Sequence, residues 1–296
     1  MYNLTDISTI KSILSKNGFH FSKALGQNFI INPDVCPLMA ENCGADRESG
    51  VIEIGPGIGV LTAELAQRAQ KVVCIELDKR LLPILSETLS DFDNVKIIND
   101  DVLKCDLKKI IEEEFAGMDV YVCANLPYYI TSPVIMMLLE SNLPIKAITV
   151  MVQKEAAQRI CADVGSRDSG AVTVAVDYYS DANKLFDVKA SSFMPAPKVD
   201  SSVIRMDIRK EKAIKVEDEK LFFAIVKAAF GQRRKTAVNS LSSGLGISKD
   251  KISEVLTSCG FDVNIRAEVM TMEDFALITS EIAKIEKLIS TNSPKS

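Results

Sequence analysis

The stretch EIGPGIG, residues 53–59, follows an apolar run typical of a buried β-strand and precedes the amphipathic run VLTAELAQRA, which is typical of a helix. Its glycines, Gly55, Gly57 and Gly59, allow a tight turn and let the backbone approach a ligand beside the helix N-terminus. A dinucleotide fingerprint would need Gly or Ala where this chain has Val60, and a Walker loop would need Gly-Lys-Ser/Thr. The loop therefore favours a different nucleoside ligand, although taken alone it could simply close a strand–helix unit.

The sequence around this loop alternates short apolar runs with longer amphipathic stretches. From residue 50 to residue 153 the apolar runs are VIEIG, VVCIEL, VKIIN, VYVCANL and IKAITVMVQ, with helix-like stretches between them. This alternation predicts repeated βαβ units and an α/β fold with a mostly parallel, doubly wound sheet. Two later runs, at 171–179 and 201–209, are expected to form an antiparallel edge pair.

The β pattern fades after about residue 215, and the remaining runs are typical of helices that end at Gly or Ser. A charged segment at 209–220 separates the two patterns. We therefore expect a sheet domain over residues 1–209 and a smaller all-helical domain over residues 210–296.

Composition excludes several classes of protein. With 296 residues, 47% of them hydrophobic, the chain can bury a large core. Its first twenty residues lack the apolar block of a signal peptide, and no apolar run reaches the roughly 20 residues that span a bilayer. We therefore expect a soluble, cytoplasmic protein without a membrane partner. Seven cysteines without a CxxC pair favour reduced, buried thiols, and because His20 is the single histidine, no metal site is expected.

The charge of the chain is unevenly distributed. Its net charge is −5, but residues 195–251 contain 13 Lys and Arg against 7 Asp and Glu. An acidic body with a basic segment is compatible with one positive face directed at phosphate groups.

Acidic residues stand at the ends of the next two predicted strands. Glu76 stands near the end of VVCIEL, 21 positions after Gly55. At the tip of the second strand, an acidic side chain can accept hydrogen bonds from both hydroxyls of a ribose. The third strand ends in NDDVL, so Asp100 or Asp101 can accept a hydrogen bond from the amino group of an adenine. Together with the glycine loop, these strand ends look like the nucleoside site of a class I, Rossmann-like methyltransferase that uses S-adenosylmethionine.

The fourth strand runs into Asn125, Leu126, Pro127 and Tyr128, at the position where a methyl acceptor belongs. If the Asn125 side-chain oxygen and the Leu126 carbonyl each accept one hydrogen of an adenine amino group, the nitrogen lone pair can be directed at the methyl group. Pro127 stiffens the segment, and Tyr128 offers a face on which the base can stack. For the tetrapeptide alone, a proline-terminated strand with core aromatics is the alternative.

Motifs along nearly the whole chain then point to one family. They are KALGQNFI at 23–30, EIGPGIGVLT, IELD, NDDVL, NLPYYITSP, FMPAPKVDSSV at 193–203 and FGQRRKT at 230–236. In combination they resemble the ribosomal RNA adenine dimethyltransferases, and most closely their small-subunit (KsgA-type) branch. The resemblance implies an N-terminal catalytic domain that binds S-adenosylmethionine and a C-terminal helical domain that binds RNA.

The resemblance also implies roles for individual residues. Asp101, rather than Asp100, would meet the adenine ring of the cofactor, and Phe193 would sandwich the target base opposite Tyr128. The implied cofactor residues are Asn28, Ile30, Gly55, Gly57, Glu76, Asp101 and Asn125. The cations available to RNA phosphates are Lys23, Arg233, Arg234 and Lys235.

The implied reaction is dimethylation of N6 of two adjacent adenosines in the 3′-terminal hairpin of small-subunit (16S) rRNA. The implied setting is an immature 30S particle, acted on by a monomeric protein with a role in small-subunit biogenesis. One alternative is a large-subunit rRNA adenine dimethyltransferase that confers antibiotic resistance, although such proteins tend to be strongly basic and this chain has a pI near 5.2. The other alternative is a mainly non-catalytic ribosome-assembly factor.

Overall fold

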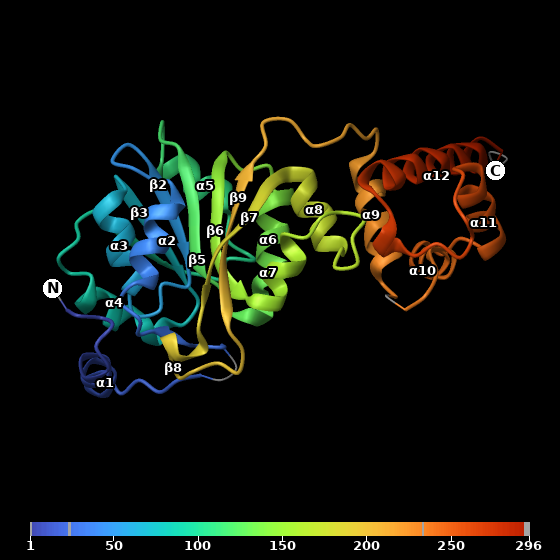
Figure 1. Ribbon diagram of the computed structural model, residues 1–296. Helices are drawn as coiled ribbons and strands as arrows, with labels where there is room; N and C mark the ends of the chain where they lie inside the picture. The colour runs from blue at the N-terminus through green and yellow to red at the C-terminus, as the bar shows by residue number, and fades with distance from the viewer. Residues whose placement is uncertain (1, 23–24, 233, 293–296) are drawn as a thin grey trace. The chain divides into compact units, whose positions relative to one another are not determined.

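The computed structural model describes residues 2–22, 25–232 and 234–292 (Figure 1). The chain divides into two compact units, Met1–Gln158 with Asp181–Ile208, and Arg159–Ser180 with Arg209–Ser296. The break after Ile208 lies one residue before the boundary expected from the sequence. Residues 159–180, expected in the sheet domain, instead group with the C-terminal helices.

The first unit is built on a seven-stranded sheet in the order β4-β3-β2-β5-β6-β9-β7. Strands β2 to β6 pair in parallel, and β9 pairs antiparallel with β6. This arrangement confirms the predicted α/β class with a mostly parallel sheet. The strands are β2 (Gly50–Ile54), β3 (Lys71–Glu76), β4 (Val95–Asn99), β5 (Val120–Asn125), β6 (Ile145–Gln153), β7 (Ser180–Val188) and β9 (Ser201–Ile208).

Helices cover both faces of this sheet (Figure 1). Successive residues of a strand point to opposite faces. In β2, Val51 belongs to a buried cluster with apolar residues of α2 (Val35–Cys43) and α3 (Val60–Arg68). A Cβ on the neighbouring Gly50 would instead lie 2.1 Å from Cδ1 of Phe115, the residue that follows α5. The sheet is therefore enclosed on both sides, and its ligand-accessible edge is the one where the parallel strands end.

The remaining helices of this unit connect the strands or precede them. Helix α1 packs its apolar side chains against α4 in a second buried cluster, which includes Phe29 and Ile58. Besides α2 and α3, the helices are α1 (Ile7–Lys16), α4 (Leu82–Thr88), α5 (Leu107–Glu114), α6 (Thr131–Glu140), α7 (Lys154–Ile160) and the 3-10 turns Lys79–Leu81, Tyr128–Ile130 (η2) and Ala190–Ser192.

The antiparallel edge of the sheet differs from its prediction. The run at 171–179, expected to be a strand, is helix α8 (Ala171–Tyr179). Its first turn is fixed by the hydroxyl of Thr173, which accepts the Gly170 N–H at 2.9 Å and donates to the Arg159 carbonyl at 2.6 Å. The edge strand is β7, whose polar sequence SDANKLFDV suits an exposed edge.

A separate two-stranded sheet links distant parts of the first unit. Strand β1 (Phe29–Ile30) pairs antiparallel with β8 (Phe193–Met194), and Ile30 lies opposite Phe193. The Ile31 N–H extends this pairing by donating to the Ser192 carbonyl at 2.9 Å. The N-terminal segment is thereby fastened to the loop that precedes β9.

The second unit is built of helices, as the sequence predicts for its C-terminal part. Helix α9 contacts α8, α10 and α12, and the approach of α9 to α10 is close, since a Cβ on Gly244 would lie 2.5 Å from the Ala228 Cβ. The C-terminal helices of the second unit are α9 (Glu219–Phe230), α10 (Ala237–Leu245), α11 (Lys249–Ser258) and α12 (Met272–Asn292). None of the described helices combines the length and apolar character needed to cross a bilayer.

Candidate active site

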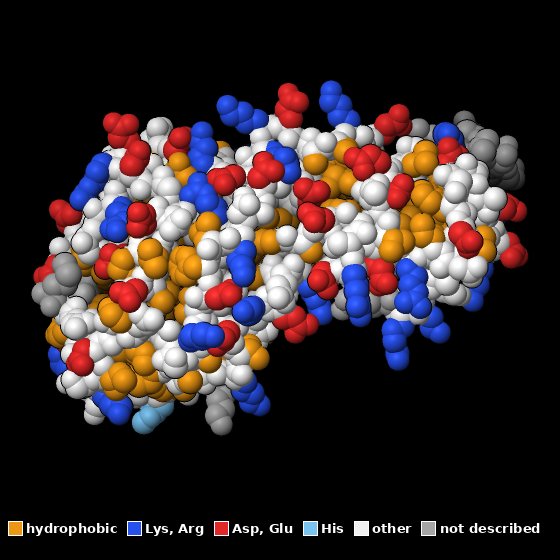
Figure 2. All heavy atoms as spheres, in the orientation of Figure 1, with side chains coloured by type: hydrophobic (Ala, Val, Ile, Leu, Met, Phe, Trp, Pro, Cys, Tyr) orange, Lys and Arg blue, Asp and Glu red, His pale blue; other side chains and the backbone are white. Residues whose placement is uncertain are grey.

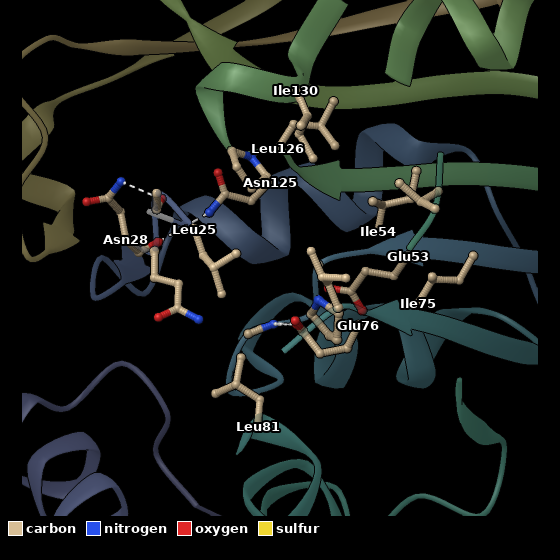
Figure 3. A pocket seen from close by; sticks show the side chains of 18 of the residues that line it. Leu25, Asn28, Glu53, Ile54, Ile75, Glu76, Leu81, Asn125, Leu126 and Ile130 are labelled. Carbon is tan, nitrogen blue, oxygen red and sulfur yellow. Dashed lines mark hydrogen bonds between the residues drawn. The ribbon is translucent and has the colours of Figure 1, made fainter. Parts of the chain in front are cut away.

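One cavity of the first unit, of about 270 Å³, lies where strands β2, β3 and β5 end (Figure 3). In an open α/β sheet this is the edge at which ligands bind. Its lining includes all the residues that the sequence assigned to the cofactor and to the target base. They are Asn28, Ile30, Gly55, Gly57, Glu76, Asp101, Asn125, Leu126, Pro127, Tyr128 and Phe193.

The glycine loop presents bare backbone to this cavity. Gly55 and Gly57 have φ values of +69° and +61°, a conformation that residues with a Cβ rarely adopt. A Cβ on Gly55 would meet no atom within 4 Å, whereas one on Gly57 would lie 3.3 Å from the ring of Phe29. The loop therefore forms a cradle in which a ligand can touch the main chain directly.

Glu76, at the end of β3, is buried beside the cradle. Its Oε1 accepts the Asp78 N–H at 2.8 Å and its Oε2 accepts the Gly57 N–H at 3.4 Å. Burial raises the pKa of this carboxyl to about 7, because two backbone donors do not replace the lost water. The two hydroxyls of a ribose would supply further donors, so the site fits the nucleoside of S-adenosylmethionine.

Two carboxylates follow β4 at the cavity. Asp100 is exposed and its Oδ1 accepts the Asp101 N–H at 2.7 Å. Asp101 is half-buried, accepts the Leu103 N–H at 3.1 Å and pairs with the Lys104 ammonium at 3.2 Å. Both carboxylates line the cavity, and the choice of Asp101 for the cofactor adenine stays a prediction.

Asn125, the last residue of β5, faces the N-terminal segment across the cavity (Figure 3). Its Nδ2 donates to the Asn28 carbonyl at 3.5 Å, and the Asn28 side chain donates in turn to the Gly26 carbonyl at 3.0 Å. With the amide nitrogen of Asn125 turned toward the Asn28 carbonyl, its Oδ1, which is the acceptor of the group, is left for a ligand.

The backbone after Asn125 is held so that a second acceptor is left open. The Leu126 N–H donates to the Met151 carbonyl of β6 at 3.2 Å, and the Pro127 carbonyl accepts the Ile130 N–H at 3.1 Å. No hydrogen bond within the described residues ends on the Leu126 carbonyl. The Asn125 side chain and the Leu126 carbonyl are therefore two acceptors on one rigid segment.

Two aromatic rings line the cavity near this segment. Tyr128 is half-buried, and its hydroxyl lies 3.0 Å from Oγ of the buried Ser201. Phe193 is only 4% exposed and packs in a hydrophobic cluster with Ile30. Phe193 is thus an enclosed wall of the cavity, and its stacking against the target base opposite Tyr128 stays a prediction.

A polar network that the sequence reasoning missed holds the N-terminal segment on the cavity. Gln27 donates to the Asp78 carboxylate at 2.8 Å and accepts the Ser22 N–H at 2.9 Å. Arg80 pairs with the same carboxylate at 2.6 Å and lies over the ring of Phe19, 5.0 Å from its centre. Since Asp78 also donates its N–H to Glu76, the ribose-binding candidate and the N-terminal segment share one anchor.

Glu53 was missed as well. It lines the cavity from β2, is 1% exposed and accepts a weak hydrogen bond from the Cys74 thiol at 3.5 Å. Burial raises the pKa of Glu53 to about 7, against the effect of its hydrogen bonds to Thr62 and Cys74. A carboxyl within an otherwise apolar buried strand is a signal that could have singled it out.

Of the four cations predicted to contact RNA, two fall within the described residues. Lys23 and Arg233 are outside the described residues. Arg234 and Lys235 are exposed between α9 and α10 of the second unit. Figure 2 shows Lys and Arg side chains gathered along an edge of this unit beside α10.

Comparisons with known proteins agree with this site. A family model described as ribosomal RNA adenine dimethylase matches residues 18–284. The ribosomal RNA small subunit methyltransferase A of Alkaliphilus oremlandii is 48% identical over 93% of this chain and 96% of its own. Among solved structures, a dimethyladenosine transferase from Plasmodium falciparum superposes with a TM-score of 0.69 at 25% identity, over 86% of this chain and 97% of that one. The 23S rRNA methyltransferase ErmE superposes with a TM-score of 0.64 at 25% identity, over 86% of this chain and 100% of that one.

These matches span both units and confirm the resemblance inferred from the motifs. The cavity is compatible with this family, since it brings the glycine loop and Glu76 together with Asn125 and the Leu126 carbonyl. The chain is a methyltransferase and belongs to the ribosomal RNA adenine dimethylase family.

Proposed function

We propose that the protein transfers methyl groups to N6 of two adjacent adenosines in the 3′-terminal hairpin of small-subunit rRNA. The observation that carries this proposal is the placement of Asn125 and Leu126 in the same cavity as the glycine cradle and Glu76. S-adenosylmethionine, the cofactor of the family, supplies an electrophilic methyl group when it is bound.

The residues that would hold the cofactor are those of the cradle and the walls around it. Glu76 would accept the ribose hydroxyls, Asp101 would accept the adenine amino group, and Gly55 and Gly57 would let the main chain approach. Asn28 and Ile30 of the N-terminal segment would cover the cofactor, and the Gln27–Asp78 contact would keep that cover in place.

The chain activates the acceptor by positioning and polarisation. An adenine amino group is a weak nucleophile because its lone pair is delocalised into the ring. When Asn125 Oδ1 and the Leu126 carbonyl accept its two hydrogens, the nitrogen can pyramidalise and direct its lone pair out of the ring plane. Tyr128 offers its face to the base, and such stacking contributes about 1–3 kcal/mol. No strong base is needed, because the nitrogen becomes acidic only after it has been methylated.

Small-subunit rRNA is favoured over large-subunit rRNA by two observations. The relative named for the small subunit is 48% identical, whereas the 23S rRNA methyltransferase is 25% identical. The pI near 5.2 also differs from the strongly basic character expected of the resistance enzymes. We further propose that the protein acts as a monomer on an immature 30S particle in the cytoplasm, with the first unit as catalytic domain and the second as an RNA-binding domain.

Methyl transfer from labelled S-adenosylmethionine to unmethylated small subunits, with large subunits in parallel, tests the proposal. Dimethyladenosine in the small-subunit hairpin is expected, and Asn125→Ala should abolish it. Asn183→Ala, which alters an exposed residue of β7, serves as the matched control. Product only in large-subunit RNA would identify the resistance activity, and no transfer to either particle would favour a non-catalytic assembly factor.

A further inference from the structure

The second tyrosine of the NLPYY motif, Tyr129, has no part in the chemistry described above. Its side chain is 54% exposed, and the other exposed aromatic side chain among the described residues is Tyr2. The two differ in their surroundings. The Tyr2 hydroxyl donates to Glu87 at 2.7 Å, whereas Tyr129 makes no hydrogen bond through its side chain within the described part of the chain. A single exposed apolar residue is common at a protein surface. Tyr129 differs because it also lines the reaction cavity, so its exposed ring is available to a bound substrate.

Tyr129 stands at the mouth of the reaction cavity. It lines the cavity and follows Tyr128 directly in the 3-10 turn η2, yet Tyr128 is half-buried and hydrogen-bonded to Ser201. The two neighbouring rings therefore meet different environments, since both line the cavity but Tyr128 is half-buried and Tyr129 is mostly exposed. An inner ring can hold a base that has entered, and an outer ring can hold a base that has not.

The glycine turn of the N-terminal segment lies beside the outer ring. A Cβ on Gly26 would lie 3.6 Å from Cδ1 and 3.7 Å from Cε1 of Tyr129, so the space between the turn and the ring could hold one methyl group. The Gly26 carbonyl is itself held by the Asn28 side chain at 3.0 Å. One edge of the ring is thus bordered by a hydrogen-bonded turn of the chain.

We propose that Tyr129 stacks on the unpaired base next to the target adenosine, a proposal that rests on the function given above. Extruding the target removes a stacking partner from its neighbour, and a ring at the cavity mouth replaces it. Stacking on an aromatic ring accepts any base, and a purine offers the larger surface. Two adjacent adenosines suit this arrangement, because the nucleotide beside the target is then itself a purine.

The first test compares Tyr129→Ala, Tyr129→Phe and, as matched control, Tyr2→Ala on unmethylated small subunits. Tyr129→Ala should raise the KM for subunits roughly 5- to 150-fold, the range that loss of one stacked base implies. The KM for S-adenosylmethionine should not change, because the ring does not belong to the cofactor cradle. Tyr129→Phe, which keeps the ring, should behave like the wild type, as should Tyr2→Ala.

The second test changes the RNA. Small subunits are reconstituted with rRNA in which the adenosine beside the target is replaced by uridine, and binding and methylation of the remaining adenosine are measured. Wild-type affinity should fall, and the affinity of Tyr129→Ala should fall no further. Equal losses of affinity in wild type and Tyr129→Ala would overturn the proposal, and would be expected if the ring bound a protein partner instead. A Tyr129→Ala variant with the same KM for subunits as Tyr2→Ala would also overturn it.

Folding and function are kept separate in this design. Thermal unfolding and binding of S-adenosylhomocysteine establish that Tyr129→Ala is folded with an intact cofactor site. If the wild type binds small subunits but transfers no methyl group, the proposed function fails, and the binding comparison between adenosine and uridine particles still decides the role of Tyr129.

Discussion

The carboxyl group of Glu53 is shielded from water at the cavity, and its burial links stability to pH. In the folded chain this carboxyl has a pKa of about 7, so it keeps its proton at a pH at which the unfolded chain, with the ordinary pKa of 4.5, has released it. The folded state is therefore favoured at low pH and loses that advantage as the pH rises through 7.

Replacement by the neutral isostere tests this link. Glu53→Gln should raise the free energy of unfolding at pH 8 by on the order of 3 kcal/mol relative to wild type, and change it little at pH 5. Denaturant unfolding at both pH values measures the difference. Glu112→Gln, at an exposed position of α5, is the control, and an equal effect of Glu53→Gln at pH 5 and pH 8 would contradict the explanation.

Glu76 titrates in the same range, but its titration should appear in ligand binding. Burial raises its pKa to about 7, and only the ionised carboxylate can accept both ribose hydroxyls. The Kd for S-adenosylhomocysteine should therefore rise roughly tenfold as the pH falls from 8 to 6, in proportion to the lost ionised fraction. Calorimetry can measure this change. Glu76→Gln should bind more weakly with a flat profile, and a variant that kept the slope would assign the titration to another group.

At the scale of single residues, the sequence predicted correctly which side chains at the strand ends line the cavity. Gly55, Glu76 and Asn125 each follow from a short motif at the end of one strand, so their common position in the cavity needed only the order of the sheet. Gln27 and Asp78 were missed because their contact joins residues 51 positions apart, and no local pattern marks it.

Among the elements, the N-terminal segment (residues 19–22 and 25–30) is held over the cavity in part by the carboxylate of Asp78. Asp78→Ala removes the acceptor of both Gln27 and Arg80, so this segment should open more often. We expect roughly tenfold weaker binding of S-adenosylhomocysteine, on the scale of losing one charged hydrogen bond, with faster hydrogen exchange confined to residues 19–22 and 25–30. Asp119→Asn, which breaks an exposed ion pair with Lys146, is the control. Unchanged exchange in this segment would show that other contacts hold it.

Helix α8 and strand β7 show where reasoning from local pattern failed. Alternating Val and Thr in AVTVAVDYY favour a strand, but contacts of Thr173 with Gly170 and Arg159 start a helix there. The polar sequence of β7 carries little β signal because an edge strand buries only part of its surface. Both outcomes depend on the tertiary surroundings of the segment.

At the scale of the whole molecule, an acidic protein that binds RNA must concentrate its positive charge. The net charge is −5, yet the segment 195–251 is basic and includes the exposed Arg234 and Lys235. If both contact phosphates of the rRNA, Arg234→Gln with Lys235→Gln should lower the slope of log affinity against log salt by about 1.4–1.8. Titration of small subunits at several salt concentrations measures the slope. Lys249→Gln with Lys251→Gln, in the same unit, is the matched pair, and equal slopes for both pairs would argue for diffuse attraction.

The pairing of β1 with β8 would affect how the protein carries out several methyl transfers in succession. Because the two strands are hydrogen-bonded to each other, the cavity wall beside Asn28 is tied to the wall formed by Phe193. A ligand that orders one wall should also order the other, so we expect the small molecule and the RNA to strengthen each other's binding. Release of the spent small molecule would then loosen both walls at once, and each further methyl group would begin with the cavity reopened.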